Sequence, residues 1–277
     1  MNQYKYIKKN LELLIEGDFL DGKKNGHIKE YGSYGQLLFE GEYIKDERNG
    51  KGKEYNGFNH ELIFEGEYIK GKRWNGKGKE YNDKNELIFE GEYINGEKTG
   101  KGKEYHTNHN IFFKGEYLKG KWNGNIKEYD IGGLLLFEGE YLNGERNGKG
   151  KEYHYKELIF EGEYLNNKRW KGKGKEYGYN CKIIYEGEYL NGERNGKGKE
   201  YHDNGVILFE GEFKNGKLNG IGKEYYRNGT LKYVGEFVDG KWNGKGKEYF
   251  QNGRLKFEGE FLNGHQTPEK PKHLINF

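Results

Sequence analysis

The chain has 277 residues, of which 34% are charged, 32% are hydrophobic and 47 are glycine, a composition typical of disordered chains that bury too little apolar surface to fold. The aromatic fraction of 16% argues against disorder, because disordered chains are poor in aromatic residues. The net charge is +3, from 48 basic and 45 acidic residues interleaved along the chain, so we expect no nucleic-acid binding, which needs a basic excess on one face.

A Glu-Gly-Glu tripeptide, with close variants, recurs along most of the chain at spacings of 23 to 25 residues. A fixed period in this range indicates a repeat array. We expect residues 1–10 to be a lead or cap, residues 11–264 an array of about eleven repeats, and residues 265–277 a tail or cap. The central glycines of the tripeptides are Gly17, Gly41, Gly66, Gly91, Gly115, Gly139, Gly162, Gly187, Gly211, Gly235 and Gly259.

The unit at residues 135–153 illustrates the structure that each repeat predicts. In residues 135–142, Phe137, Gly139 and Tyr141 alternate with glutamates, which is the period of a β-strand. Residues 149–153 alternate in the same way, and the Asn-Gly-rich segment 143–148 between the two predicts a hairpin loop. We therefore predict an all-β fold, an elongated, single-sheet antiparallel meander of about eleven two-stranded repeats that forms a solenoid-like ribbon.

The two faces of this sheet are expected to differ. On one face, aromatic rings cover the glycines of the neighbouring strand, and each buried ring contributes about 1.5–3 kcal/mol. On the other face, Glu138 and Glu140 lie opposite Lys149 and Lys151 of the next strand, at about 0.2–1 kcal/mol for each cross-strand pair. Most lysines are therefore expected to neutralise glutamates and not to form a ligand-binding patch.

The repeat also resembles a known family. Residues 185–192, Tyr-Glu-Gly-Glu-Tyr-Leu-Asn-Gly, followed by Asn-Gly-Lys-Gly at 195–198, are similar to the MORN repeat (membrane occupation and recognition nexus), and the resemblance covers about residues 11–264. The family's Trp after Gly-Glu is Tyr or Phe here, and its Gly-x-Gly is lost at Ile28 and at Ile126. The Lys-Glu-Tyr ending resembles divergent MORN-like repeats of bacteria, protists and giant viruses. The resemblance implies scaffolding, protein–protein association and phospholipid contact.

The tryptophans and arginines near the hairpin loops are the candidate site residues. All four tryptophans lie two residues before the glycine that opens the second strand, and counting that position along the array gives an alternation of Trp with Lys or Arg. Both Trp and Arg are enriched in binding hot spots, so we predict a Trp/Arg rim along this loop edge. The alternative is that each ring packs on its own hairpin or on a cation of the next repeat. The predicted rim comprises Trp74, Trp122, Trp170, Trp242, Arg48, Arg73, Arg146, Arg169 and Arg194.

Nothing in the sequence indicates catalysis. His106, His154 and His202 recur two repeats apart, about 19 Å by strand spacing, and cannot share a metal ion. The Asn-Gly-Lys-Gly-Lys motif lacks the spacing and the following helix of a phosphate loop. We expect no catalytic residue, no metal site and no cofactor.

The leading hypothesis is a non-enzymatic scaffold that binds a protein partner through its sheet surface and the Trp/Arg rim. The first alternative is peripheral binding of anionic phospholipid through the same edge, and a third is carbohydrate binding by exposed rings. The single cysteine, Cys181, is typical of a reducing compartment, and residues 1–10 carry no apolar segment of signal-peptide length. We therefore expect a cytoplasmic protein, in solution or peripheral at a membrane, with self-association through the array ends as a further option.

Overall fold

The computed structural model describes residues 4–10, 13–179 and 181–267. Within these residues every regular element is a β-strand and none is a helix, which confirms the predicted all-β fold. The chain divides into two compact units, residues 1–145 (unit 1) and 146–277 (unit 2). Each unit is an antiparallel meander, as the repeat predicted.

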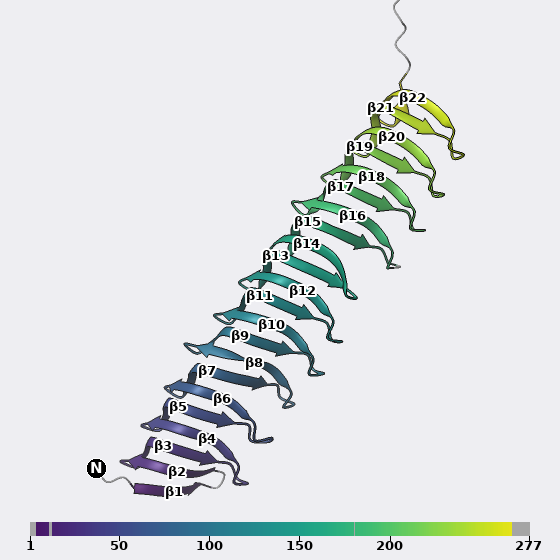
Figure 1. Cartoon of the computed structure of the whole chain (residues 1–277). Helices are drawn as coiled ribbons and strands as arrows, with labels where there is room; N and C mark the ends of the chain where they lie inside the picture. Colours follow the sequence, from purple (N-terminus) through teal and green to yellow (C-terminus); the bar gives the residue numbers. More distant parts are fainter. Residues whose placement is uncertain (1–3, 11–12, 180, 268–277) are drawn as a thin grey trace, which may run out of the picture. The chain divides into compact units, whose positions relative to one another are not determined.

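In unit 1 the strands pair in chain order, each antiparallel to the one that follows it, from β1 to β12 (Figure 1). Residues 1–10, the expected lead or cap, contribute the first strand, which pairs with the second along its whole length. The strands are β1 (Tyr4–Asn10), β2 (Leu13–Leu20), β3 (Lys23–Tyr31), β4 (Leu37–Ile44), β5 (Glu47–Tyr55), β6 (Leu62–Ile69), β7 (Lys72–Tyr81), β8 (Leu87–Ile94), β9 (Glu97–Tyr105), β10 (Ile111–Leu118), β11 (Lys121–Tyr129) and β12 (Leu135–Leu142).

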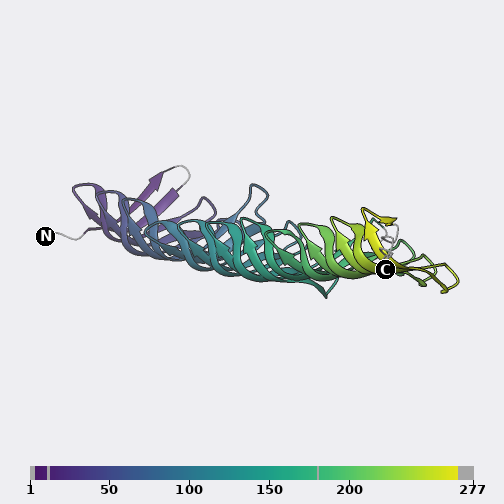
Figure 2. The ribbon, with the colours of Figure 1, turned by 90° about the horizontal axis from the view of Figure 1, so that it is seen from above.

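Unit 2 repeats this arrangement, and Figure 2 shows the successive strands of each unit as similar arcs. Of the expected tail, His265 and Gln266 form a short last strand, and residues 268–277 lie outside the described part of the chain. The strands are β13 (Glu145–His154), whose first residue Glu145 is the last residue of unit 1, β14 (Glu157–Leu165), β15 (Lys168–Tyr177), β16 (Ile183–Leu190), β17 (Glu193–Tyr201), β18 (Ile207–Lys214), β19 (Lys217–Tyr225), β20 (Leu231–Val238), β21 (Lys241–Tyr249), β22 (Leu255–Leu262) and β23 (His265–Gln266).

The hairpin turn within each repeat is shorter than the sequence predicted. Residues 143–148 were expected to form a loop, but the turn is Asn143-Gly144 alone, and β13 begins at Glu145. The φ angles of 54° at Asn143 and 92° at Gly144 are those of a tight turn with both central residues left-handed, for which Asn-Gly is the favoured pair. The residues that follow the turn therefore belong to the sheet.

A bulge follows each tight turn and explains why the second strand of a repeat carries extra residues. In β4 and β5 the register passes from Gly41–Gly52 to Tyr43–Arg48, so β5 has two more residues than β4 over this stretch. A glutamate of the first strand occupies the bulge: the Lys101 amide donates to Glu92 at 3.1 Å. The second glutamate of Glu-Gly-Glu thus holds the bulge, in addition to facing lysines as predicted.

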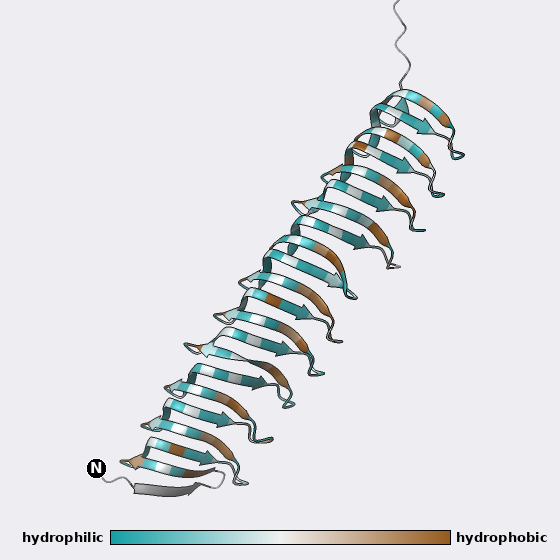
Figure 3. Cartoon of the chain, viewed as in Figure 1, coloured by the Kyte–Doolittle hydropathy of each residue, from teal (hydrophilic) through white to brown (hydrophobic). Residues whose placement is uncertain are grey.

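The first glutamate of the tripeptide does pair with lysine across strands, as the alternation predicted. Lys103 lies 2.6 Å from Glu90, and Lys53 lies 3.1 Å from Glu65. These pairs are one third to one half exposed to solvent, so each contributes little to stability. Figure 3 shows the result, strands that are mostly hydrophilic with hydrophobic bands recurring on the even-numbered strands.

The core is a ladder of edge-to-face aromatic rings on the other face. Phe39 lies 5.5 Å from Tyr43 of its own strand and 5.3 Å from Tyr68 of the next repeat, measured between ring centroids. Residues four apart in a straight strand are separated by roughly 13 Å, so the strand must bend toward this face for the two rings to meet. The bend encloses the rings, and Phe39 is 0% exposed although the described residues form no second layer over the sheet.

Glycine is required beneath these rings. A Cβ atom built on Gly102 would lie 2.8 Å from the ring of Tyr117 and 2.9 Å from the ring of Phe89. Rings from two successive repeats therefore cover the bare backbone of the intervening strand, which confirms the predicted pairing of aromatic residues with glycine.

Candidate functional site

A row of glutamates closes the aromatic face. These are the glutamates of the Lys-Glu-Tyr ending. Each lies opposite the phenylalanine or tyrosine that precedes Glu-Gly-Glu, or its variant, in the next repeat, as Glu80 lies opposite Phe89. Tyr93 of the next repeat donates its hydroxyl to Glu80 at 2.6 Å, and Lys98 lies 2.8 Å from the same carboxylate. Each carboxylate thus links one repeat to the next.

The ionisation of this row follows its partners. Burial disfavours the charged form of Glu80, but hydrogen bonds from Lys98 and Tyr93 outweigh burial and hold the pKa of Glu80 below its usual value. At Glu200 burial prevails over the attraction of Arg194, and the pKa of Glu200 is raised. The difference arises because the next repeat offers Glu200 neither a tyrosine nor a cation.

The predicted arginines serve this row and the rings beneath it. The guanidinium of Arg48 lies 4.0 Å from the ring centroid of Phe39, and its Nε donates to the Tyr43 hydroxyl at 3.2 Å. Its other nitrogens pair with Glu30 at 3.1 Å and with Glu54 at 3.4 Å. Arg48 therefore bridges two repeats from inside the bend, as the packing alternative supposed.

The other predicted arginines take the same place. Arg73 pairs with Glu54 at 2.8 Å and lies over the ring of Phe64, and Arg169 does the same with Glu152 and Phe160. Arg194 binds Glu176 and Glu200 over the ring of Tyr185, and Arg146 lies 6.0 Å from the ring of Tyr164. The charges of these arginines are directed at the chain itself.

Two of the predicted tryptophans replace the arginine at this position. Trp122 is 8% exposed and packs at 3.9 Å from Tyr117, centroid to centroid. Trp242 stacks on Tyr233 at 4.5 Å and donates its Nε1 hydrogen to Glu224 at 2.8 Å. Both rings are therefore part of the ladder.

The remaining two tryptophans are insertions, and here the predicted alternation of Trp with a cation is wrong. The strand register pairs Tyr68 with Arg73 and Tyr164 with Arg169, so the arginines hold the ladder position and Trp74 and Trp170 are the added residues. Trp74 packs near the turn of the next hairpin, and Trp170, at 37%, is the most exposed of the four. Most of the predicted rim is thus engaged in packing, and binding through it stays a prediction.

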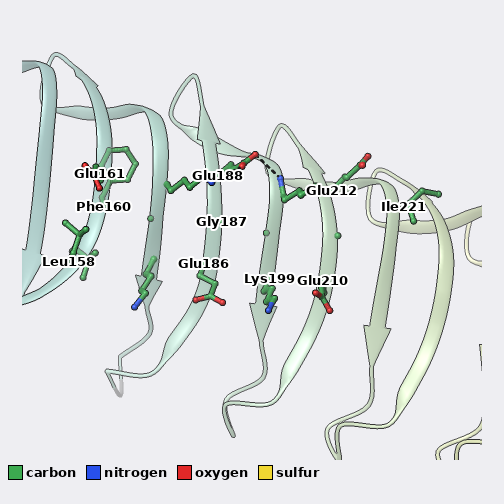
Figure 4. Close-up of a pocket in the computed structure, with 17 residues that line it drawn as sticks. Leu158, Phe160, Glu161, Glu186, Gly187, Glu188, Lys199, Glu210, Glu212 and Ile221 are labelled. Atoms are coloured by element: carbon green, nitrogen blue, oxygen red, sulfur yellow. Dashed lines mark hydrogen bonds and ion pairs between the residues drawn. The ribbon is translucent and has the colours of Figure 1, made fainter.

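Sequence reasoning missed a groove on the opposite, charged face of unit 2, which crosses β14 to β19. Its floor is the main chain of glycines that include Gly187, which lies between two charged residues whose side chains point to the charged face. Figure 4 shows Glu186, Lys199 and Glu210 on one side of this floor, and Glu188 and Glu212 on the other. The spacing that builds the groove, a charged residue on each side of a glycine, is already present in the sequence.

The walls of the groove are repeated and nearly neutral. The two walls are about 7 Å apart, the distance between residues i and i+2 of a strand, and like charges recur along each wall about every 9.6 Å, every second strand. Lys173 pairs with Glu188 at 3.5 Å. Lys197 and Lys199 form no ion pair with the part of the chain that the structure describes. The groove therefore offers free cations beside carboxylates at a fixed interval.

No group of three or more His, Cys, Asp or Glu in the described ranges could share a metal ion. The described residues likewise contain no helix that is long and apolar enough to cross a membrane. The exposed Cys181 is a free thiol.

The fold and this surface define a repeat protein of stacked β-hairpins. The MORN repeat model matches just over half of the chain, and the chain belongs to the MORN repeat family. The matched residues are 16–27, 39–57, 89–111, 137–155, 185–206, 209–231 and 233–253. The unmatched stretches include the repeats that carry Trp74, Ile126 and Trp170, where the sequence departs from the repeat.

No curated protein matches the chain. Among solved structures, the crystal structure of TcdB2-TccC3 is similar at 10% identity and a TM-score of 0.23, over 91% of this chain and 18% of that chain. The crystal structure of TcdB2-TccC3-Cdc42 is similar at 10% identity and a TM-score of 0.21, over 88% of this chain and 13% of that chain. The chain thus spans less than a fifth of these proteins, and a likeness this low carries no argument about its function.

Proposed function

We propose that this chain is a non-enzymatic scaffold that binds an extended segment of a partner protein along the groove of unit 2. The observation that carries the proposal is the groove itself, a floor of glycine main chain between two charged walls that recurs on the four strands β15 to β18. A surface that repeats one set of groups suits a ligand that also repeats, and it lacks the single cluster of unlike groups that catalysis requires.

The spacing of the walls fits one backbone conformation particularly well. A polyproline II segment advances about 3.1 Å per residue and about 9.3 Å per three-residue turn. Like charges along a groove wall recur about every 9.6 Å, so a charge at every third residue of such a segment would meet one groove charge in each repeat. A straight β-strand, at about 3.3 Å per residue with side chains on alternate faces, matches this interval less closely.

The rival surfaces have less support. The arginines that would meet a partner or anionic head groups at the loop edge are paired with glutamates, as Arg48 is with Glu30 and Arg194 is with Glu176. Releasing them would leave half-buried carboxylates unpaired, which costs free energy. Of the rim residues, Trp170 is the one best placed to contact a membrane or a partner.

The test is fluorescence anisotropy with labelled proline-rich peptides that carry lysine at every third residue. A peptide of the same composition with lysine at every fourth residue, about 12.4 Å apart, is the spacing control. We expect saturable binding of the first peptide and little of the second. Equal binding of both peptides, or of neither, would overturn the proposal.

A charge reversal on the groove wall checks the location. Lys197→Glu removes a free cation from the groove, so a peptide with glutamate at every third residue should bind several-fold more weakly, because one cross-interface charge pair becomes repulsive. Lys245→Glu is the matched control, since Lys245 holds the same place in its repeat but does not line the groove. Sedimentation with anionic vesicles runs beside these assays. Vesicle binding without peptide binding would favour the membrane alternative.

A further inference from the structure

The hairpin edge of unit 1 carries a row of half-exposed aliphatic side chains. Each is the last residue of an even-numbered strand, and by the alternation of the strand it shares the charged face of the sheet. Their exposed fractions lie between 40% and 52%, which is high for residues of this kind that recur in every repeat. This aliphatic edge row consists of Leu20, Ile44, Ile69, Ile94, Leu118 and Leu142.

A charged residue lies beside each member of the row. The first residue of each odd-numbered strand pairs across the tight turn with the aliphatic residue, as Glu47 pairs with Ile44 and Lys72 pairs with Ile69. Directly paired residues share a face of the sheet. This edge charge row consists of Lys23, Glu47, Lys72, Glu97, Lys121 and Glu145, all exposed.

The signs of the edge charge row alternate strictly along unit 1, one sign per repeat. Neighbouring members are two strands apart, about 9.6 Å, which is too far for them to pair with one another. No ion pair joins any of them to the described part of the chain, although lysines nearer the centre of the same face, such as Lys53, have partners at hydrogen-bond distance. Pairing within the chain therefore does not account for the alternation.

An alternating row with an even number of members is complementary to a reversed copy of itself. If two copies meet antiparallel about a two-fold axis, the first member lies opposite the sixth, the second opposite the fifth and the third opposite the fourth. Lys23 then meets Glu145, Glu47 meets Lys121, and Lys72 meets Glu97, while the aliphatic rows face each other between them. A two-fold interface requires such self-complementarity.

We infer that the hairpin edge of unit 1 is the surface through which two copies of this chain associate side by side, antiparallel. The inference goes beyond the proposed function, since it concerns another surface and another partner. The occupant is a second copy because the charge pattern selects it: in a parallel, unshifted arrangement every member would face a like charge, which is repulsive.

Unit 2 keeps the alternation only at its first two positions, so the six-member alternating row is a feature of unit 1. The edge charges of unit 2 begin as Lys168 and Glu193 but continue as Lys217, Lys241 and His265. Within the same stretch the aliphatic residue of β18 is replaced by Lys214, which pairs directly with Lys217. Lys214 and Lys217 place two positive charges where unit 1 has one aliphatic and one charged residue, and so would disfavour the same antiparallel contact.

The footprint sets the expected strength. Six half-exposed aliphatic side chains and six exposed charges per copy place the interface at the low end of specific interfaces, about 1,200 Å² in total. Such interfaces are weak, and their exposed ion pairs are screened by salt. We therefore expect a reversible dimer in the micromolar range or weaker that dissociates further in high salt.

The test is sedimentation velocity of the full chain over a range of concentrations, with two charge-uniform variants. Glu47→Lys combined with Glu97→Lys makes five of the six edge charges positive, and Lys72→Glu combined with Lys121→Glu makes five negative. Each variant alone should be monomeric where the unaltered chain is dimeric, and an equal mixture of the two should recover a dimer. Circular dichroism checks that both variants fold.

The control is Lys241→Glu, which reverses an edge charge of unit 2 where the alternation is lost and should leave the dimer unaffected. A chain that stays monomeric at several hundred micromolar overturns the inference. So does a dimer that survives in each charge-uniform variant, or a mixture of the two variants that remains monomeric.

Discussion

Replacing Phe213 with tyrosine would supply a hydroxyl that the glutamate row lacks at one point. In the preceding repeat, Tyr189 donates to Glu176 at 2.7 Å. Phe213 holds the equivalent place beside Glu200, is 4% exposed, and packs edge-to-face at 5.3 Å from Tyr185. The added hydroxyl would therefore lie within reach of the Glu200 carboxylate without disturbing the ladder.

The expected size of the effect follows from this geometry. A hydrogen bond to a charged group contributes about 1.5–3 kcal/mol, and part of that is lost in removing the hydroxyl from water, so we expect a net effect of about 1–2 kcal/mol. One pKa unit corresponds to about 1.36 kcal/mol, so the pKa of Glu200 should fall by about one unit.

The sign of the pH dependence is also fixed. Burial raises the pKa of Glu200, so its ionisation opposes folding, and acidification through that pKa stabilises the unaltered unit 2. Phe213→Tyr should reduce this gain, because the new hydrogen bond favours the ionised form.

Carbon-detected NMR titration of the Glu200 carboxyl would measure the shift directly, and hydrogen exchange of the β17 and β18 amides would report the local stability. Phe237→Tyr is the matched control, because Glu224 already accepts from Lys232 at 2.6 Å and from Trp242 at 2.8 Å. We expect a smaller change there. An unchanged or raised pKa of Glu200, or an equal drop at Glu224, would refute the reasoning.

Three further predictions concern the ladder and its charges. Gly102→Ala places a methyl group 2.8 Å from the Tyr117 ring and should destabilise unit 1 by about 1–3 kcal/mol, measured by urea unfolding. Trp122→Ser should destabilise by about 3–5 kcal/mol, whereas Trp170→Ser should change stability little, because Trp122 is 8% and Trp170 is 37% exposed. Comparable losses in both would show that the inserted tryptophan also packs. The lowered pKa of Glu80 means that its contribution is present above the unfolded pKa, about 4.3, and is lost as the pH falls through the folded value. The urea midpoint of unit 1 should therefore fall in acid, and Glu80→Gln should flatten that dependence.

The strands and their faces were predictable because the alternation is local. Phe137, Gly139 and Tyr141 recur at every second residue, and this period alone assigns them to one face of a strand. The ring contacts over glycine then follow from the pairing of neighbouring strands. The glutamate of the Lys-Glu-Tyr ending could have been placed the same way, since Glu152 lies two residues after Gly150 and so on the glycine face.

The positions of the candidate site residues were harder to predict because a bulge shifts the pairing of the two strands after the turn. All four tryptophans lie the same number of residues before the glycine that follows them. In the structure, however, the residue that faces the tyrosine of the preceding strand is set by its distance from the tight turn before it. The two counts agree at Trp122 and disagree at Trp74 and Trp170, where one residue is added. The sequence shows that a residue is added in these two repeats. It does not show whether the arginine or the tryptophan pairs with Tyr68 or Tyr164, because that depends on which side chain packs against the tyrosine.

The links that the glutamate row makes between repeats run in one direction along the chain. A carboxylate of one repeat is bound by the tyrosine and the cation of the repeat that follows, as Glu80 is bound by Tyr93 and Lys98. At β23, Gln266 donates its amide to Glu248 at 2.8 Å and takes the part that a cation plays elsewhere. Removing an interior repeat would bring an equivalent donor to the carboxylate before it wherever the following repeat carries the tyrosine and the cation. Cutting the chain after Gly264 would instead take the Gln266 donor from Glu248. An array held together in this way can change its length from within more readily than at this end.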